Sequence, residues 1–376
     1  MTKPIFIGHP IYGSSTYGSG HPLAIPRVSL ATDLVRALGW LDKTTYVESR
    51  QATHDELASF HSADYIEALI NAERQSPSEA DRTRYNIGIN GNPIYSEMFR
   101  RPATACGGGQ MAANLLMSGE VGCVFNIAGG QHHGLANKAS GFCYLNEPVL
   151  TIQRFLEMGA RRVFYLDIDA HFGDGTQLAF HDEDRVFTLS VHEHGRWPQT
   201  RNLSPGDPGS VEDRAGGMAR NLPVPKGLND TEFNYLIDTV AMALISNFKP
   251  DVIYLQCGAD ALADDPQSKL ELSNLAIWRV VEELKQLGLP LLVSGGGGYN
   301  PFSVGRCWAG VWAQMNGIKI PTVLNEGAER LLRDVTWHHR KAKTPPDRWF
   351  TALADAPNQG PIRDDIYELA QKSLNN

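Results

Sequence analysis

Short apolar segments alternate with segments of helical periodicity along most of the chain. A short apolar segment bounded by turn residues is typical of a buried strand, whereas apolar residues repeating every three or four positions indicate a helix. The pattern predicts strands at residues 121–127, 162–166, 186–191, 252–256 and 289–293. It predicts helices at residues 103–116, 149–157, 230–245, 275–287 and 304–315. This alternation predicts an α/β protein with a central parallel sheet covered by helices on both faces.

No internal repeat or low-complexity linker interrupts the alternation, so we expect residues 1–376 to form a single domain. Two long polar segments, residues 74–92 and 195–219, are predicted to be loops beside a ligand site. The Pro-rich residues 341–361, part of a C-terminal extension over 316–376, are expected to wrap around the surface. Ligands of parallel sheets bind beyond the carboxyl ends of the strands, so the residues that follow each strand are the functional candidates.

The densest group of ionisable residues follows the strand predicted at 162–166. In an extended segment Asp167, Asp169 and His171 would project to the same side, because successive side chains alternate. Two buried carboxylates repel each other and lose hydration unless a cation lies between them. The pattern therefore predicts a divalent metal site. Helix capping and a turn at Asp174 and Gly175 are the alternative interpretation.

Two adjacent histidines, His132 and His133, follow glycines at the end of the strand predicted at 121–127. Adjacent histidines can bind a metal, but imidazoles that transfer protons are usually oriented by carboxylates. We therefore expect these two to pair with Asp167 and Asp174. Another histidine pair, residues 338–339, lies in a polar C-terminal segment and is expected to be exposed to solvent.

Two further strand ends supply candidate residues. Asp260 follows the strand predicted at 252–256, where an unpaired carboxylate would be costly, so it is the candidate third metal ligand. Residues 295–298 are all glycine and are not followed by the Lys-Ser/Thr of a phosphate-binding loop. They permit close backbone approach and leave Tyr299 as the long side chain at the tip, suited to donate its hydroxyl to a developing oxyanion. A packing tyrosine is the alternative.

Composition narrows the choice of partners. The formal net charge of −8 argues against a nucleic-acid partner, whose phosphates require basic residues. No segment approaches the ~20 apolar residues of a membrane span, so we expect no membrane partner and a cytoplasmic location. The five cysteines are widely spaced and are expected to be reduced core thiols, none of them a zinc ligand. The sequence is compatible with a homo-oligomer.

Taken together, the motifs resemble those of the zinc-dependent histone deacetylase family, which includes bacterial acetylpolyamine amidohydrolases and acetoin-utilisation proteins. The family is related in fold to arginase, so the resemblance implies a three-layer arginase/deacetylase-like fold. It extends over about residues 20–315. The matching segments are residues 21–22, 26–27, 61–65, 129–146, 167–175, 258–260 and 295–300.

The resemblance implies an enzyme that hydrolyses a linear amide and releases acetate or another short acid. Zinc is the implied cofactor, and its implied ligands are Asp169, His171 and Asp260. The implied catalytic residues are the proton-transfer pair with its carboxylates and the tyrosine that polarises the acyl carbonyl, namely His132, His133, Asp167, Asp174 and Tyr299.

The same resemblance implies a narrow channel and a structural potassium ion. Residues that line the channel or its rim are Gly141, Phe142, Trp197 and Gln267. The implied potassium site consists of Asp167 and Ser190 with the main-chain carbonyls of Asp169, His171 and Val191. A second monovalent-cation site is expected near Phe180 and Val186.

The sequence departs from the family at the rim of the channel. Family members that deacetylate peptides carry an aspartate that grips the substrate backbone, whereas residues 89–93 here contain none. Gln267 stands where polyamine-preferring relatives have a glutamate and others a leucine or methionine, and residues 196–200 lack the usual Gly-Thr-Gly. The implied partner is therefore a small acylated amine, such as an acetylpolyamine, or an acyl-lysine side chain, without a choice between them.

Two other functions fit parts of the pattern. A binuclear, arginase-like manganese ureohydrolase would need a further carboxylate near Asp264 and two metal ions per chain. A non-catalytic acyl-ligand binding protein would keep the pocket without the reaction. The order of the histidine pair, the Asp-x-Asp-x-His motif and the Gly-Tyr motif favours the zinc family, and none of its implied site residues is missing.

Overall fold

The computed structural model describes residues 3–18, 20–199 and 203–375. Residues 200–202, which belong to the predicted loop 195–219, lie outside the described residues, and residue 200 is also the last residue of the rim segment 196–200. The described chain forms one eight-stranded sheet in the order β2-β1-β3-β8-β7-β4-β5-β6, with every neighbouring pair parallel. The strands are β1 (Ile5–Gly8), β2 (Tyr46–Glu48), β3 (Cys123–Asn126), β4 (Val163–Asp167), β5 (Val186–Glu193), β6 (Ala219–Val224), β7 (Val252–Gln256) and β8 (Leu291–Ser294).

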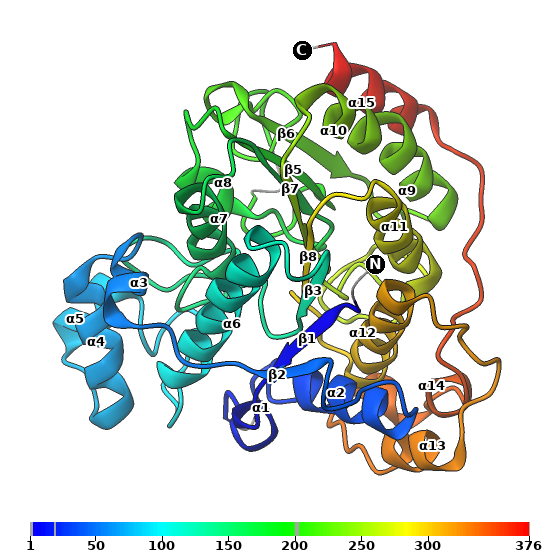
Figure 1. Ribbon diagram of the computed structural model, residues 1–376, viewed down its shortest axis with the longest axis horizontal. Coiled ribbons are helices and arrows are strands. Elements are labelled where there is room, and N and C mark those ends of the chain that lie inside the picture. The colour runs from blue at the N-terminus through cyan, green and yellow to red at the C-terminus, as the bar shows by residue number, and fades with distance from the viewer. Residues whose placement is uncertain (1–2, 19, 200–202, 376) are drawn as a thin grey trace.

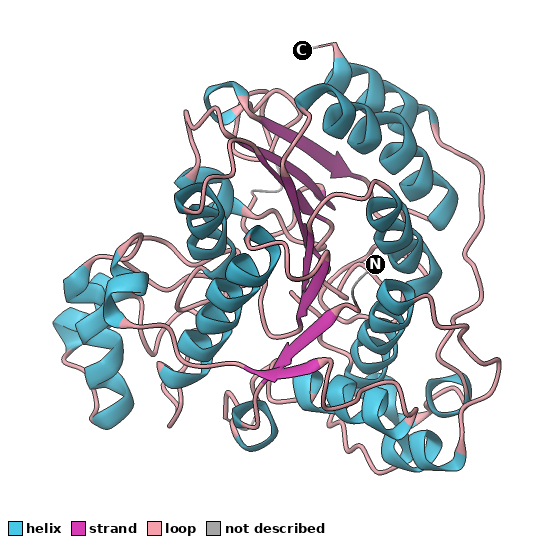
Figure 2. Ribbon diagram, viewed as in Figure 1, coloured by secondary structure: helices cyan, strands magenta, loops and turns pink. Residues whose placement is uncertain are grey.

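Helices cover both faces of the sheet, with α6, α7 and α8 on one side and α2, α9, α10, α11 and α12 on the other (Figure 1, Figure 2). The helices are α1 (Ile11–Ser14), α2 (Arg27–Ala37), α3 (His54–Ala58), α4 (Ala63–Arg74), α5 (Glu79–Tyr85), α6 (Arg100–Met117), α7 (Glu147–Glu157), α8 (Asp174–Ala179), α9 (Asp230–Leu236), α10 (Met242–Phe248), α11 (Asn274–Gln286), α12 (Pro301–Asn316), α13 (Glu326–Arg333), α14 (Arg348–Thr351) and α15 (Asp364–Leu374). The predicted fold class is confirmed.

Each predicted strand and helix is present, with ends shifted by a few residues. The sequence pattern missed β1, β2 and β6; β2 has only three residues, and β6 contains Arg220, Asn221 and Pro223. Proline is tolerated there because β6 is an edge strand, where one side needs no ladder hydrogen bond. The helix predicted at 230–245 extends to Phe248 and contains a π-helical turn, Ile237–Ala241.

Two segments contain more structure than the sequence predicted, the loop 74–92 and the C-terminal tail. Residues 74–92 include α5, which begins after Ser78, whose hydroxyl accepts a hydrogen bond from the Asp81 backbone N–H at 3.1 Å. The prediction of a continuous loop was wrong because a short polar helix shows no apolar periodicity. The tail 341–361 does more than wrap the surface: Trp349 is buried and stacks on Phe302 of α12, with ring centroids 5.1 Å apart.

A row of polar residues crosses the sheet near the carboxyl ends of its strands. Register neighbours in this row are Asn126, Ser294, Gln256, Asp167, Ser190 and Asn221, each no more than 6% exposed. The preceding strand residues are mostly apolar and form the core with the helices. The row therefore separates the apolar part of the sheet, which forms the core, from the loops at the carboxyl ends of the strands, which carry the candidate functional residues.

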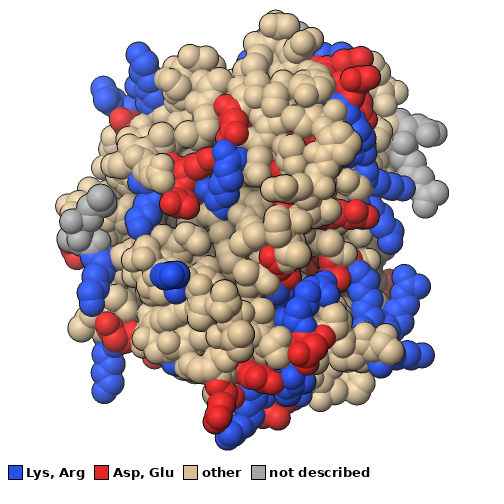
Figure 3. Space-filling model, turned by 90° about the vertical axis from the view of Figure 1, so that its right-hand side faces the viewer, with Lys and Arg blue, Asp and Glu red and all other residues tan. Residues whose placement is uncertain are grey.

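The surface shows no dominant charge on the face in Figure 3, where acidic and basic side chains are interspersed, most densely in the lower part of the view. Among the described helices, none is both long enough and apolar enough to span a bilayer.

Candidate metal centre and active site

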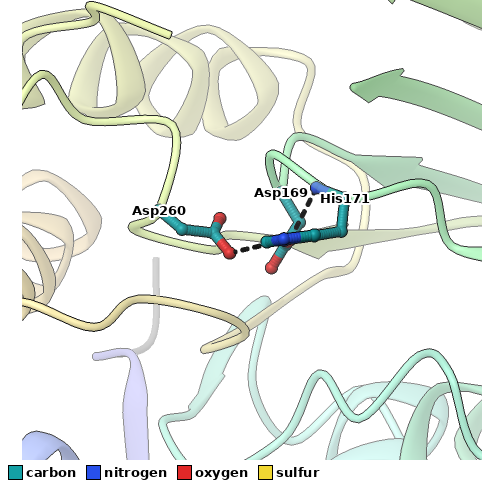
Figure 4. A group of neighbouring side chains, drawn as sticks. All are labelled: Asp169, His171 and Asp260. Carbon is teal, nitrogen blue, oxygen red and sulfur yellow. Dashed lines mark hydrogen bonds and ion pairs between the residues drawn. The ribbon is translucent and has the colours of Figure 1, made fainter. Parts of the chain in front are cut away.

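Three ligand-type side chains meet where β4 and β7 end. Asp169 and His171 follow β4, Asp260 follows β7, and Figure 4 shows the three pointing toward one another. One ligand atom of each lies within 4.8 Å of the others, and all three residues are buried. The His171 Nδ1 atom lies 2.9 Å from Asp260 Oδ2 and 3.3 Å from Asp169 Oδ1. This donor set, one imidazole nitrogen and two carboxylates, fits a zinc ion with a coordination position left open.

Backbone groups hold the two carboxylates in place. The Ala170 N–H donates to Asp260 Oδ1 at 2.9 Å, and the Gly297 N–H donates to Asp169 Oδ2 at 2.6 Å. Glycine is required in the surrounding loops, because a Cβ at Gly258 would lie 2.1 Å from Asp169 Oδ2 and one at Gly297 would lie 2.1 Å from Asp260 Oδ2. Such supporting hydrogen bonds fix the orientation of metal ligands.

The electrostatic surroundings of the group favour a positive charge at its centre. Burial alone would lower the pKa of His171, but Asp260 and Asp169 outweigh burial and raise it to about 10. Burial would raise the pKa of Asp169, but the neighbouring His132 and His171 outweigh it and hold that pKa well below its usual range. Burial and the charge of Asp169 raise the pKa of Asp260. A cation in this position neutralises both carboxylates.

The adjacent histidines form a second group beside the first. His132 Nδ1 lies 2.7 Å from Asp167 Oδ2, and His133 Nδ1 lies 2.7 Å from Asp174 Oδ1. Each imidazole is therefore oriented by its own carboxylate at Nδ1, and the two Nε2 atoms lie 3.0 Å apart. This is the pairing that the sequence predicted. The other histidine pair differs: His338 is exposed, and His339 stacks on Trp337.

The environment pushes the pKa values of the two histidines apart. Burial lowers the pKa of His132, but Asp167 and Asp169 outweigh burial and raise it to about 9. Burial, assisted by the charge of His132, lowers the pKa of His133 to about 4. These shifts favour the proton on His132 rather than on His133. A pair of this kind offers one proton donor and one proton acceptor in the same place.

Tyr299 lies across the cavity from the histidines. Its ring centroid is 6.4 Å from that of His171 and 6.2 Å from that of Phe142. Burial and the charge of Asp260 raise the pKa of its phenol well above 10, so the hydroxyl keeps its proton and can donate it. Two cavities meet at this point: an inner cavity, lined also by Arg27 and Arg101, and an outer cavity, lined also by Trp197 and Gln267. The residues that line both are His133, His171, Gly141, Phe142 and Tyr299.

Aromatic side chains narrow the outer cavity. The Trp197 ring centroid is 4.7 Å from that of His133, and the opposite wall is Phe142, which has a φ of 68°. The Asn92 Oδ1 atom accepts the Phe142 N–H at 2.8 Å and holds this conformation. Between the walls lies Gly141, with a φ of 53°; a Cβ there would lie 2.4 Å from Trp197 and 2.6 Å from His133.

Gly141→Ala is therefore expected to lower kcat/KM by a factor on the order of 10², because a shift of the walls by about 1 Å misplaces the substrate. The measurement is steady-state kinetics with any substrate that the wild-type protein turns over. Gly119→Ala is the matched control: Gly119 has a φ of 76° but no atom within 4 Å of the added Cβ. The control is expected to lose a little stability and no activity. Equal activity in both variants would mean that the channel does not pass between these walls.

Comparison with known proteins agrees with this geometry. Residues 21–315 match the family model of the histone deacetylase domain. The chain belongs to the histone deacetylase family. Histone deacetylase 9 of Arabidopsis thaliana is 38% identical over 301 residues, which cover 79% of this chain and 69% of that protein. Acetoin utilization protein AcuC of Bacillus subtilis (strain 168) is 34% identical over 332 residues, which cover 85% of this chain and 83% of that protein.

Solved structures extend the similarity to the whole fold. The crystal structure of a histone deacetylase homologue from Aquifex aeolicus matches with a TM-score of 0.92 and 35% identity, covering 99% of this chain and 100% of that one. A structure of a homologue complexed with SAHA matches equally well. The predicted resemblance is confirmed.

The mouth of this histone deacetylase-family cavity is built from the residues that departed from the family pattern. Asn90, Arg196, Trp197 and Gln267 line the outer cavity. Arg196 forms two hydrogen bonds with the buried carboxylate of Glu193, at 2.6 and 2.8 Å. Among the described lining residues of the outer cavity, none is an aspartate or glutamate. The mouth therefore presents two side-chain amides, the indole ring of Trp197 and the guanidinium of Arg196, which is already paired with Glu193.

Asp264 does not supply the additional metal ligand that an arginase-like site would need. The side chain of Asp264 turns to the C-terminal segment, where it accepts hydrogen bonds from Arg348 and from the Trp349 Nε1–H, the latter at 2.7 Å. Within the described residues, the single group suited to hold a metal ion is that of Asp169, His171 and Asp260.

Three charged residues near the site were given no role by the sequence: Glu147 and Asp265 are buried, and Arg27 is half-buried. Arg27 lines the inner cavity and donates to the Gly296 carbonyl at 2.7 Å. Glu147 accepts the Gly130 N–H at 2.8 Å and so supports the loop before His132. Asp265 accepts the Tyr299 N–H at 2.6 Å. In the sequence, the one feature that could have drawn attention to them is that each is a charged residue close to a predicted strand end or to a motif that matches the family.

Proposed function

We propose that this protein is a zinc-dependent amidohydrolase that removes an acetyl or other short acyl group from an N-acylated amine. The observation that carries the proposal is the convergence at one cavity of the His132–His133 pair, Tyr299 and the metal-type group, of which Asp169 and His171 line the cavity and Asp260 lies beside them. Each part alone has another explanation, but amide hydrolysis uses all three at the same carbonyl.

Zinc bound by Asp169, His171 and Asp260 would polarise the acyl carbonyl and lower the pKa of water at the site from about 15.7 toward ~7. His133, neutral and oriented by Asp174, accepts the proton of the attacking water. The charged His132 stabilises the negative charge that develops, and a proton from the pair leaves with the amine. Tyr299 donates its hydroxyl to the oxyanion.

The inner cavity suits the second product. It is lined by Arg27 and Arg101, and the Arg27 Nε atom is buried without a hydrogen-bond partner. A carboxylate is the natural acceptor for such a donor. Acetate released behind the reacting carbonyl can therefore occupy this cavity while the amine leaves through the outer one.

Charge at the mouth favours one class of amine. A polyamine carries additional ammonium groups, and the described lining of the outer cavity offers no carboxylate to receive them. An acyl-lysine side chain or a neutral acyl monoamine needs no such partner beyond the aromatic walls. We therefore propose acyl-lysine or a small acyl monoamine as the substrate class, ahead of acetylpolyamines.

Two monovalent-cation sites belong to the same proposal. Asp167 Oδ1 and the Ser190 hydroxyl, with the carbonyls of Asp169, His171 and Val191, would hold potassium behind the metal group. Asp167 and Ser190 are register neighbours on β4 and β5, which supports this assignment. The second site, near Phe180 and Val186, has only the family resemblance in its favour.

Tyr299→Phe is expected to preserve zinc content and KM while lowering kcat by a factor on the order of 10²–10³, since one transition-state hydrogen bond is lost. Steady-state kinetics on the variant test this expectation. An unchanged kcat would make Tyr299 a packing residue and would favour the binding-protein alternative.

A substrate screen tests the proposed function itself. Zinc-loaded protein is incubated with an acetyl-lysine peptide, acetylputrescine, acetylspermidine and longer acyl-lysines, and the released acid is quantified. We expect hydrolysis of acetyl-lysine to exceed that of acetylspermidine. The opposite order would overturn the substrate class, and hydrolysis of none of these amides would overturn the function.

A further inference from the structure

One buried carboxylate beside the site takes no part in the chemistry described so far. Asp265 lies in the loop that follows β7, between Asp260 and Gln267, and is only 2% exposed. Its Oδ2 atom accepts the backbone N–H of Tyr299 at 2.6 Å, and its Oδ1 atom accepts the backbone N–H of Gln267 at 2.8 Å. Both oxygens are therefore committed to backbone donors on two different loops.

The backbone of the loop after β8 is fixed by a small number of hydrogen bonds, among them those that Arg27 donates to the Gly296 and Gly298 carbonyls at 2.7 and 3.4 Å. Residues 295–298 are glycines, which contribute no side-chain packing, and Gly298 has a φ of 133°. Gly297 is held through its N–H by Asp169 and through its carbonyl by the Ala259 N–H. The next anchored backbone donor is the Tyr299 N–H itself, and Asp265 is the residue that accepts it.

We infer that Asp265 is a positioning residue that aims the Tyr299 hydroxyl at the reacting carbonyl while fixing Gln267 at the mouth. This inference rests on the proposed function, in which that hydroxyl binds the acyl oxygen. The two hydrogen bonds that Asp265 accepts tie the Tyr299 backbone to the loop after β7, so a single buried side chain suffices to fix an otherwise glycine-rich tip.

The neighbouring residue supplies a matched control. Asp264 belongs to the same loop, but its carboxylate accepts hydrogen bonds from Arg348 and Trp349 on the opposite side. Replacing it therefore removes an anchor of the loop without removing a partner of Tyr299. A general effect on loop stability would appear in both variants, and an effect on Tyr299 in only one.

The test is a double-mutant cycle on the zinc-loaded enzyme. Asp265→Asn keeps one acceptor oxygen but presents an amide N–H to the second backbone donor. We expect kcat to fall by a factor on the order of 10–10², because the Tyr299 hydroxyl is slightly misplaced. In the Tyr299→Phe background the same substitution is expected to leave kcat nearly unchanged. Asp264→Asn is expected to keep kcat and zinc content while lowering the melting temperature. If D265N does not fold, D265S carries the same comparison.

A crystal structure of zinc-loaded D265N provides a readout that requires no turnover. The Tyr299 side chain is expected to leave its wild-type position or to adopt several, whereas in D264N it stays. An unmoved tyrosine, or equal losses of kcat from D265N in the wild-type and Tyr299→Phe backgrounds, would overturn the inference. If the wild-type enzyme hydrolyses no acyl amine, the proposed function fails, and the position of Tyr299 in the two crystal structures still decides the role of Asp265.

Discussion

Asp169→Ala is expected to abolish zinc binding and amide hydrolysis together. Asp169 supplies one of only two carboxylates in the group, and its partner atoms all lie within 4.8 Å. Removing it leaves two protein ligands, fewer than the three of a catalytic zinc site, and halves the negative charge that neutralises the ion. Elemental analysis after dialysis gives the metal content, and acetate release gives the activity.

The matched control for this variant is Asp264→Asn, because an arginase-like site would need a carboxylate in that region. Asp264 faces Arg348 and Trp349, so its replacement is expected to leave one zinc per chain and full activity. Full zinc occupancy in Asp169→Ala would refute the ligand assignment. Loss of metal from Asp264→Asn would revive the binuclear alternative.

His133→Ala is expected to retain zinc but to lower kcat by a factor on the order of 10²–10⁴, the usual cost of losing a general acid or base. His133 is the histidine of the pair whose pKa is lowered, to about 4, by burial and by the charge of His132. The proton is therefore favoured on His132 rather than on His133, and no other neutral base lies beside His132 Nε2 at hydrogen-bond distance in the described site.

His338→Ala separates this effect from the general loss of a histidine, because His338 is exposed and is expected to tolerate replacement. Both variants are assayed for acetate release and analysed for metal. If His133→Ala is metal-free, the imidazole is a ligand and the division between ligands and proton-transfer groups is wrong. A kcat close to the wild-type value would remove His133 from the proton-transfer pair.

Much of the fold and the site arrangement was accessible from the sequence, because each functional side chain follows a strand. Strands β3, β4, β7 and β8 are buried on both faces and give continuous apolar segments, so their ends can be located within a few residues. In a parallel sheet these ends meet at one edge, which brings His132, Asp169, Asp260 and Tyr299 together.

The remaining features depend on contacts that local sequence does not encode. Asp264 and Asp265 are adjacent and identical in type, yet one faces Arg348 and the other Tyr299. Their direction is set by the loop after β7 and by the C-terminal segment packed against it. Arg27 comes from a helix far away in the sequence, and only the folded chain brings it to the inner cavity.

Stoichiometric acetate release by metal-stripped and zinc-reconstituted protein tests the central claim most directly. With an acetyl-lysine peptide, we expect one acetate and one free amine per amide consumed, activity only after zinc is restored, and saturation at one zinc per chain. Hydrolysis that requires two manganese ions per chain, or substrate binding without acetate release at full zinc occupancy, would contradict the account.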